Sequence, residues 1–171
     1  MSRRDELLQA TVGYILQHGV ADLSLRPLAK AIGTKARLLI YHFGSREKLI
    51  EAALTAVLRD VQADFLKSGA SVLKFWKWAI LSENLPYVRL VFEVHGLAPR
   101  NPRLFGGYVR DAIDSWKAII AERIPGHNKV EMATAVIALF DGLLMDLLAT
   151  GDRRRTTKSL RLALKRIGGA L

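Results

Sequence analysis

Cysteine is absent from this sequence of 171 residues. Its absence excludes disulfides, thiolate nucleophiles and zinc sites with cysteine ligands, and it is compatible with a reducing cytoplasm. Long apolar runs are missing as well, since no continuous stretch approaches the roughly 18 residues that a membrane span requires. The first residues, MSRRDELLQATVG, also lack the apolar stretch and cleavage site of a signal peptide. We therefore expect a soluble cytoplasmic protein.

Residue patterns typical of enzymes are scarce too. The histidines are His18, His42, His95 and His127, and no two of them lie three or four residues apart. A helical metal site therefore has no obvious ligands. Neither a G-x-S-x-G motif nor a phosphate-binding glycine loop occurs. These absences predict a protein that is not an enzyme and that needs no metal or cofactor.

Positive charge is plentiful by contrast, with a formal net charge of +10 at pH 7. Such an excess favours binding to polyanions, which means nucleic acid or an anionic membrane surface. Lys and Arg outnumber Asp and Glu by only nine to six over residues 1–60, but by seven to one over residues 151–171. Charge alone therefore points to the C-terminal end and does not locate a site.

Apolar residues recur at helical spacing along nearly the whole chain, which predicts an all-α fold. We expect Ser24 to cap the second helix, and residues 151–155 (GDRRR) to form a solvated loop. Residues 67–71 (KSGAS) mark a boundary, so we expect a helix-turn-helix domain over 1–45, a connecting helix over 46–66 and a C-terminal domain over 67–171. The predicted helices are Arg4–His18, Leu25–Ile32, Lys35–His42, Arg46–Leu66, Val72–Ser82, Pro86–His95, Pro102–Ile124, Lys129–Thr150 and Thr156–Ile167.

The second and third predicted helices are very short and are separated by a turn at Gly33. Two such helices, the second with one apolar and one polar face, are typical of a helix-turn-helix that enters the major groove of DNA. Arg37 is the candidate for reading guanine, and Leu38 for contacting a thymine methyl group. The expected phosphate contacts are Tyr41, His42, Ser45 and Arg46.

Residues 10–50 resemble the DNA-binding domain of the TetR family of transcriptional regulators. The matching residues are Gly19, then Arg26, Leu28, Ala29 and Gly33 within LSLRPLAKAIG, then Leu39, Tyr41, His42 and Phe43, and finally SREKL over 45–49. The resemblance implies that Arg26, Lys35, Ala36, Arg37 and Leu38 face the DNA, and that Tyr41, His42 and Arg46 contact phosphate. Ser24 is a further candidate for DNA contact. The chain departs from the family pattern at two positions, with Leu38 where Thr is common and Ile40 where Tyr is common.

The segment Ala133–Thr150 is apolar around its whole circumference, which predicts a buried helix. Its Asp-Gly-Leu at 141–143 resembles a feature of the penultimate helix in TetR-family proteins, where the last two helices form a dimer as a four-helix bundle. The resemblance implies a homodimer, and two recognition helices about 34 Å apart would bind a palindromic operator in double-stranded DNA. The candidate interface residues are Leu139, Leu143, Leu160, Leu164 and Ile167.

The same resemblance implies a small-molecule effector, apolar or amphipathic, in the C-terminal domain. The candidate lining residues are Trp76, Trp78, Phe92, His95, Tyr108 and Trp116, with His95 or Asp141 as the polar group. Each of these aromatic residues could equally fill an ordinary core. The adopted interpretation is a ligand-responsive repressor without a membrane role. Two alternatives remain: a DNA-organising protein without a ligand, and a protein whose basic tail TTKSLRLALKRIGGAL lies on an anionic membrane.

Overall fold

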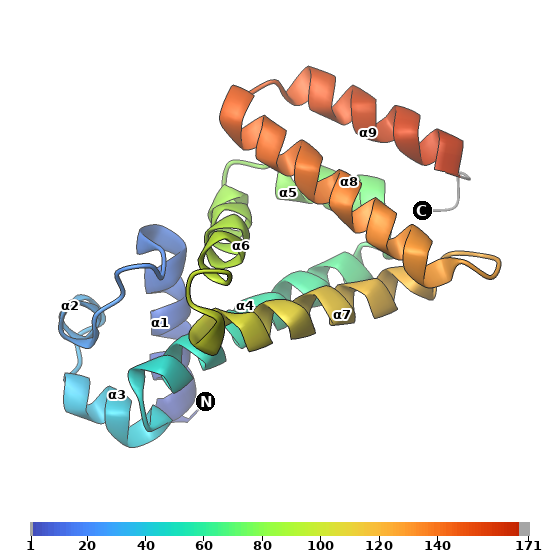
Figure 1. Ribbon diagram of the computed structural model, residues 1–171. Coiled ribbons are helices and arrows are strands. Elements are labelled where there is room, and N and C mark those ends of the chain that lie inside the picture. The colour runs from blue at the N-terminus through green and yellow to red at the C-terminus, as the bar shows by residue number, and fades with distance from the viewer. Residues whose placement is uncertain (1, 168–171) are drawn as a thin grey trace. The chain divides into compact units, whose positions relative to one another are not determined.

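A computed structural model describes residues 2–167, and within that range the chain forms helices and turns but no strand (Figure 1). The all-α prediction is therefore confirmed. The elements are α1 (Arg3–His18), α2 (Leu25–Ala31), α3 (Ala36–Phe43), α4 (Arg46–Lys67), α5 (Val72–Ala79), α6 (Leu85–Leu97), the π-helix η1 (Pro102–Gly106), α7 (Gly107–Ala121), α8 (Lys129–Thr150) and α9 (Arg153–Ile167).

Three local predictions are wrong. Ser24 precedes α2 but its side chain makes no capping hydrogen bond. The single helix expected over 102–124 is instead η1 followed by α7, where Gly106 and Gly107 are adjacent and glycine weakens a helix interior. The loop expected over 151–155 is already helical from Arg153, because the Asp152 carboxylate accepts a hydrogen bond from the Arg155 N–H at 2.9 Å and so caps α9.

The chain forms two compact units. The first unit comprises the residues up to Val61 together with Arg89–Arg110, and the second comprises Gln62–Val88 together with the residues from Asp111 onward. Helices α4, α6 and α7 each begin in one unit and end in the other.

The first unit has a continuous apolar core contributed by α1, α2, α3 and α4. Its fully covered side chains include Ile15, Leu28, Leu39 and Ile50. Helix α1 starts with a capping box, in which Ser2 and Asp5 bond each other's backbone N–H. The hydrogen bonds from the Ser2 hydroxyl and backbone also lower the pKa of the Asp5 carboxyl.

The second unit is built around α8 and α9, which lie side by side and antiparallel (Figure 1). Helix α5 packs against α9, and the Trp76 indole N–H donates to the Thr157 hydroxyl at 2.9 Å. Leu160 and Leu164 of α9 are buried within this packing. The apolar stripe of α9 is therefore already buried within a single chain, without a second copy.

Helix α8 is less covered than its sequence predicts. It is the one helix in the described chain that is long and apolar enough to cross a membrane, and only 28% of its most apolar 18-residue window is buried. The prediction of a buried helix is therefore wrong for a single chain, because only one face of α8 packs against its neighbours. A single helix of this kind is weak evidence for a membrane span, and its uncovered face equally suits another protein surface.

Candidate nucleic-acid interface

The interface begins with the turn between α2 and α3. Gly33 adopts a positive φ of 68°, and the following Thr34 N–H donates to the Ala29 carbonyl at 2.8 Å, which closes the end of α2. Leu28 of α2 and Leu39 of α3 are both fully buried. The core of the first unit thus holds the apolar sides of two helices that are too short to be stable alone.

The opposite side of α3 is open to solvent. Lys35 and Arg37 are exposed, Ala36, Leu38 and His42 are half-buried, and Tyr41 is 79% exposed. The Tyr41 and His42 rings meet edge to face, with centroids 5.1 Å apart. Ser24 and Arg26, also exposed, lie at the start of α2. A large aromatic side chain left in water on a helix of eight residues indicates a contact surface.

Arg46, one of the predicted phosphate contacts, makes contacts within its own domain. Its Nε donates to the Leu23 carbonyl at 2.6 Å, and Nη1 lies 3.5 Å from a Glu47 carboxylate oxygen. The Ser45 hydroxyl accepts from the Lys48 N–H at 3.1 Å and so caps α4. The pKa of Glu47 is lowered by its own backbone N–H and then by the Ser45 hydroxyl. Both Ser45 and Arg46 therefore also have local structural roles.

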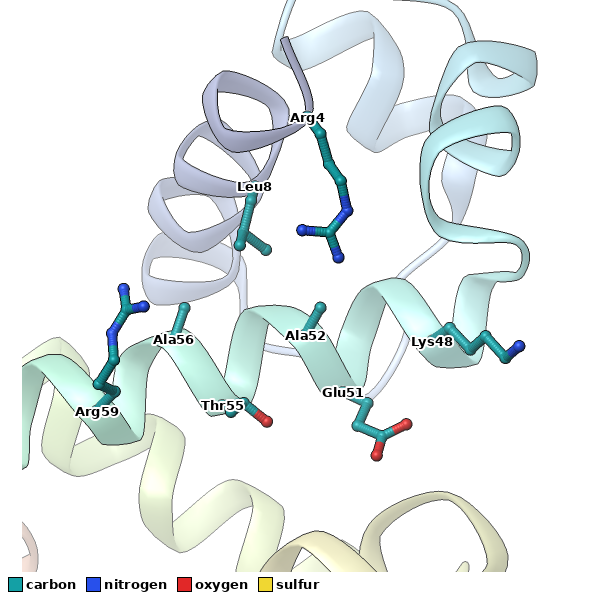
Figure 2. A pocket seen from close by; sticks show the side chains of 8 residues that line it. All are labelled: Arg4, Leu8, Lys48, Glu51, Ala52, Thr55, Ala56 and Arg59. Carbon is teal, nitrogen blue, oxygen red and sulfur yellow. The ribbon is translucent and has the colours of Figure 1, made fainter. Parts of the chain in front are cut away.

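A hollow of about 380 Å³ lies between α1 and α4 in this unit (Figure 2). Its lining includes the apolar side chains of Leu8, Ala52 and Ala56. It also includes the cationic side chains of Arg4, Lys48 and Arg59 and the carboxylate of Glu51. The Arg4 guanidinium lies 4.9 Å from the centre of the Phe43 ring, at the end of α3. Arg4 and Lys48 thus add positive charge beside the recognition helix. Neither residue was predicted from the sequence, although Lys48 follows the Ser45 cap by three residues.

The arrangement offers binding chemistry. Guanidinium, ammonium and hydroxyl donors surround an exposed helix face, which is the donor set for phosphate oxygens and base edges. No group of three or more His, Asp or Glu side chains within residues 2–167 could hold a metal ion.

The predicted effector residues are divided between the two units. Phe92, His95 and Tyr108 lie in the first unit, whereas Trp76, Trp116 and Asp141 lie in the second. His95 Nδ1 donates to the Val91 carbonyl at 2.8 Å, and the Tyr108 hydroxyl donates to the Leu54 carbonyl at 3.2 Å. Burial raises the pKa of the Tyr108 hydroxyl to about 12. Asp141 is half-buried on α8 and is not an unpartnered carboxylate.

An aromatic cluster occupies the second unit. Phe75 is its centre, stacked on Trp78 and on Phe140 with ring centroids 5.1 and 5.4 Å apart. Phe65, Trp76, Tyr87 and Trp116 complete the cluster. Trp76 is fully buried and serves as core, whereas Phe75, Trp78, Trp116 and Phe140 are only partly covered. Trp76, Trp78 and Trp116 were predicted from the sequence, whereas Phe65, Phe75, Tyr87 and Phe140 were not.

The segment that builds this interface is also the one that matches a known family. Residues 7–53, from α1 to the first turns of α4, match the model of bacterial regulatory proteins of the tetR family. This part of the chain matches the TetR family. The resemblance drawn from the helix-turn-helix residues is thereby confirmed, and it now rests on most of α1 and the whole of α2 and α3.

The curated relatives are HTH-type transcriptional regulators. The regulator BetI 1 of Chromohalobacter salexigens is 36% identical over 59 residues, which cover 34% of this chain and 29% of that protein. The chain thus spans less than a third of that relative's length in the match. BetI of Paraburkholderia phymatum is 24% identical over 94% of this chain and 89% of its own length.

Solved structures share the fold along nearly the whole chain. A regulator from Cytophaga hutchinsonii superposes with a TM-score of 0.80 at 16% identity, covering 98% of this chain and 94% of that one. The multidrug binding protein EbrR, solved in complex with proflavin, gives a TM-score of 0.71 at 22% identity over 97% of this chain and 99% of its own. At these identities the likeness concerns the fold.

Proposed function

We propose that this protein is a DNA-binding transcriptional regulator, a repressor that binds a palindromic operator through α3. The exposed face of α3 carries this proposal, because its aromatic and cationic groups stand on a helix whose other face is anchored in a buried core. Arg37 is exposed and makes no ion pair within residues 2–167. Its guanidinium is free to donate to guanine, while Leu38 contacts a thymine methyl group.

Residues around α3 would set the register on DNA. Tyr41 and His42 donate to backbone phosphates at one end of the helix, while Ser24, Arg26, Lys35 and Ala36 approach the DNA at the other. Arg4 and Lys48 add two cations at the hollow beside α3. We assign Arg46 mainly to holding the domain together, because its Nε is bonded to the Leu23 carbonyl.

Selection of binding sites from random duplex DNA at fixed salt tests the proposal. The wild type should enrich a palindrome. Arg37→Ala should change the preference at particular bases and cost about 1–3 kcal/mol of binding energy, whereas Tyr41→Ala should weaken all sites alike. Arg100→Ala is the matched control, since Arg100 is exposed in the same unit and has no such role. If the wild type enriches nothing and binds DNA only in a salt-sensitive, general way, the proposal is wrong.

We further propose that the protein is a homodimer through α8 and α9. The uncovered face of α8 carries small residues that let two helices approach closely, namely Ala135, Ala138, Gly142 and Ala149. Met145 on the same face is 56% exposed, and Leu162 on α9 is 54% exposed. Of the residues predicted for the interface, Leu139, Leu143 and Ile167 are half-buried and retain surface to share. Leu160 and Leu164 support it only indirectly, because they pack within the chain.

An apolar or amphipathic effector would bind the partly covered aromatic cluster of the second unit. EbrR was solved with proflavin, a planar aromatic cation, so proflavin is a suitable probe for Phe75, Trp78, Trp116 and Phe140. Such an effector would bind more tightly to the conformation whose recognition helices are wrongly spaced for DNA. It would then lower DNA affinity by the ratio of its own affinities for the two conformations. A regulator of this kind works in the cytoplasm, where its operator is.

The membrane-surface alternative loses support from the packing of α9. An amphipathic helix that lies on a membrane needs a free apolar face. Leu160 and Leu164, which would form that face, are buried in the second unit. The DNA-organising alternative has no effector, so it predicts that no apolar probe changes the affinity for the operator.

A further inference from the structure

We propose that Glu93 of α6 is a positioning residue that holds the loop between α1 and α2, and thereby couples α6 to the orientation of the helix-turn-helix. This inference rests on the proposed function, because it concerns how DNA binding by the same surface is controlled. Glu93 lies in the first unit and does not belong to the face expected to touch DNA.

One carboxylate oxygen of Glu93 accepts two backbone hydrogen bonds. Both the Val20 and the Ala21 N–H lie 2.8 Å from Oε1, although these residues are more than seventy positions away in sequence. Glu93 is half-buried, and no Lys or Arg pairs with it in the described part of the chain. Hydrogen bonds to an ionised acceptor are stronger than neutral ones, so the carboxylate is satisfied by the loop rather than by a cation.

The loop backbone is shaped to receive this carboxylate. Gly19 has a φ of +76°, which other residues rarely adopt. A Cβ atom at position 19 would lie 2.6 and 2.7 Å from the two oxygens of Glu93, closer than such atoms can approach. Glycine at this position therefore serves both the turn and the close approach of the carboxylate to the backbone.

A second charged side chain holds the other end of the same loop. Arg46 of α4 donates from Nε to the Leu23 carbonyl at 2.6 Å. Val20 and Leu23, the two large apolar residues of the loop, are buried. The loop leads directly into α2, so its position sets where α2 and α3 begin. Groups on α4 and α6 thus hold the helix-turn-helix through its entrance.

Helix α6 is suited to transmit a displacement. It starts in the second unit at Leu85 and passes into the first, where Glu93 lies. A hydrogen bond from N–H to oxygen weakens beyond about 3.2 Å, so a shift of α6 by about 1 Å is enough to release both bonds. A small movement of α6 thereby releases the loop from its two hydrogen bonds to Glu93.

Amide hydrogen exchange of the full-length protein tests the anchor itself. In Glu93→Ala the amides of Val20 and Ala21 should exchange about tenfold faster, while amides in the middle of α8 stay unchanged. Glu93→Asp keeps the charge but is one methylene shorter, so it should behave like Glu93→Ala. Glu93→Gln keeps the reach and should be intermediate. Glu83→Gln, an exposed carboxylate just before α6 whose described contact is with Ser82, is the matched control and should match the wild type.

Binding to two duplexes tests the coupling. One duplex carries the palindrome found by selection, and the other carries a single half-site. Glu93→Ala should lower affinity for the palindrome by about tenfold and leave half-site affinity unchanged, because each recognition helix is still folded but the two are no longer held at one spacing.

Each outcome bears on a different statement. Unchanged exchange at Val20 and Ala21 in Glu93→Ala would overturn the anchor. An equal loss on both duplexes would overturn the coupling, because it would mean general damage to the domain. If the wild type binds neither duplex specifically, the proposed function fails together with the coupling, while the exchange rates still report whether Glu93 holds the loop.

Discussion

Arg155 and Asp146 form a paired contact across the turn that joins α8 and α9. Nη1 and Nη2 of the guanidinium donate to the two oxygens of the carboxylate at 2.6 and 2.8 Å. The same guanidinium reaches Asp152 at 3.3 Å and the Thr150 hydroxyl at 3.3 Å. A planar, bidentate pair of this kind fixes the angle between two helices more firmly than a single contact does.

This pair predicts a sensitivity to acid. The hydrogen bonds from Arg155 lower the pKa of Asp146 below its ordinary value of 3.8. A carboxyl whose pKa is lowered in the folded state adds stability that is complete above pH 3.8 and is lost as the pH falls through the folded value. We expect Arg155→Met to lower the unfolding temperature slightly at pH 7 and to make little difference at pH 2. An equal effect of the substitution at both pH values would contradict this assignment.

Tyr108 predicts a change at the alkaline end. Its pKa is raised from 10.0 to about 12 by burial, so the neutral hydroxyl is the form that the fold favours. The stability it adds is complete below pH 10 and is lost as the pH rises toward 12. In a spectrophotometric titration, one tyrosine should ionise near pH 12, and Tyr108→Phe should remove that step. The substitution should also cost about 1 kcal/mol, the value of one hydrogen bond.

Lys48 and Arg46 should have opposite consequences although they are close in sequence. Lys48→Gln should reduce the dependence of DNA affinity on salt by about one phosphate contact, a change of about 0.9 in the slope of log K against log salt, with no loss of stability. Arg46→Gln should lower the unfolding temperature, because its Nε bond to the Leu23 carbonyl is lost. Lys117→Gln in the second unit is the control for charge. The assignments are reversed if Lys48→Gln unfolds the domain and Arg46→Gln does not.

The proposed dimer makes Met145 a sensitive position. It is 56% exposed on the uncovered face of α8, so Met145→Arg should place a charge in the interface and shift the protein to monomers in analytical ultracentrifugation. Leu66, 47% exposed on α4, provides a control of similar exposure. Leu66→Arg should leave the mass unchanged. A wild-type protein that is already monomeric at micromolar concentration would exclude the interface.

Trp76 should behave as core and not as a ligand contact. It is fully buried with its N–H bonded to Thr157, so Trp76→Ala should cost about 3–5 kcal/mol of stability in chemical denaturation. Trp116→Ala should cost less stability and more affinity for proflavin, measured by the change in proflavin fluorescence, because Trp116 is only partly covered. Equal proflavin affinity in the wild type and in Trp116→Ala would remove the aromatic cluster as the effector site.

The sequence was enough to predict the helix-turn-helix and its family. Caps, glycines and apolar spacing act within a few residues, so α8 was predicted at its observed bounds and α2 and α3 within a residue of theirs. The buried positions Leu28 and Leu39 and the exposed positions Arg37 and Tyr41 also follow from helical periodicity over a short stretch. Local information of this kind was insufficient for η1 and for the start of α9, where neighbouring propensities compete.

Contacts between residues that are distant in sequence could not be predicted from helical periodicity or local sequence signals. Glu93 meets Val20 and Ala21, Tyr108 meets Leu54, and Phe75 joins Phe140, all across separations that no periodic pattern records. Periodicity predicts which side of a helix is apolar, but it does not predict which other residues cover that side. Whether Leu160 faces its own chain or a partner, and whether Arg46 is free for DNA, depends on packing in three dimensions.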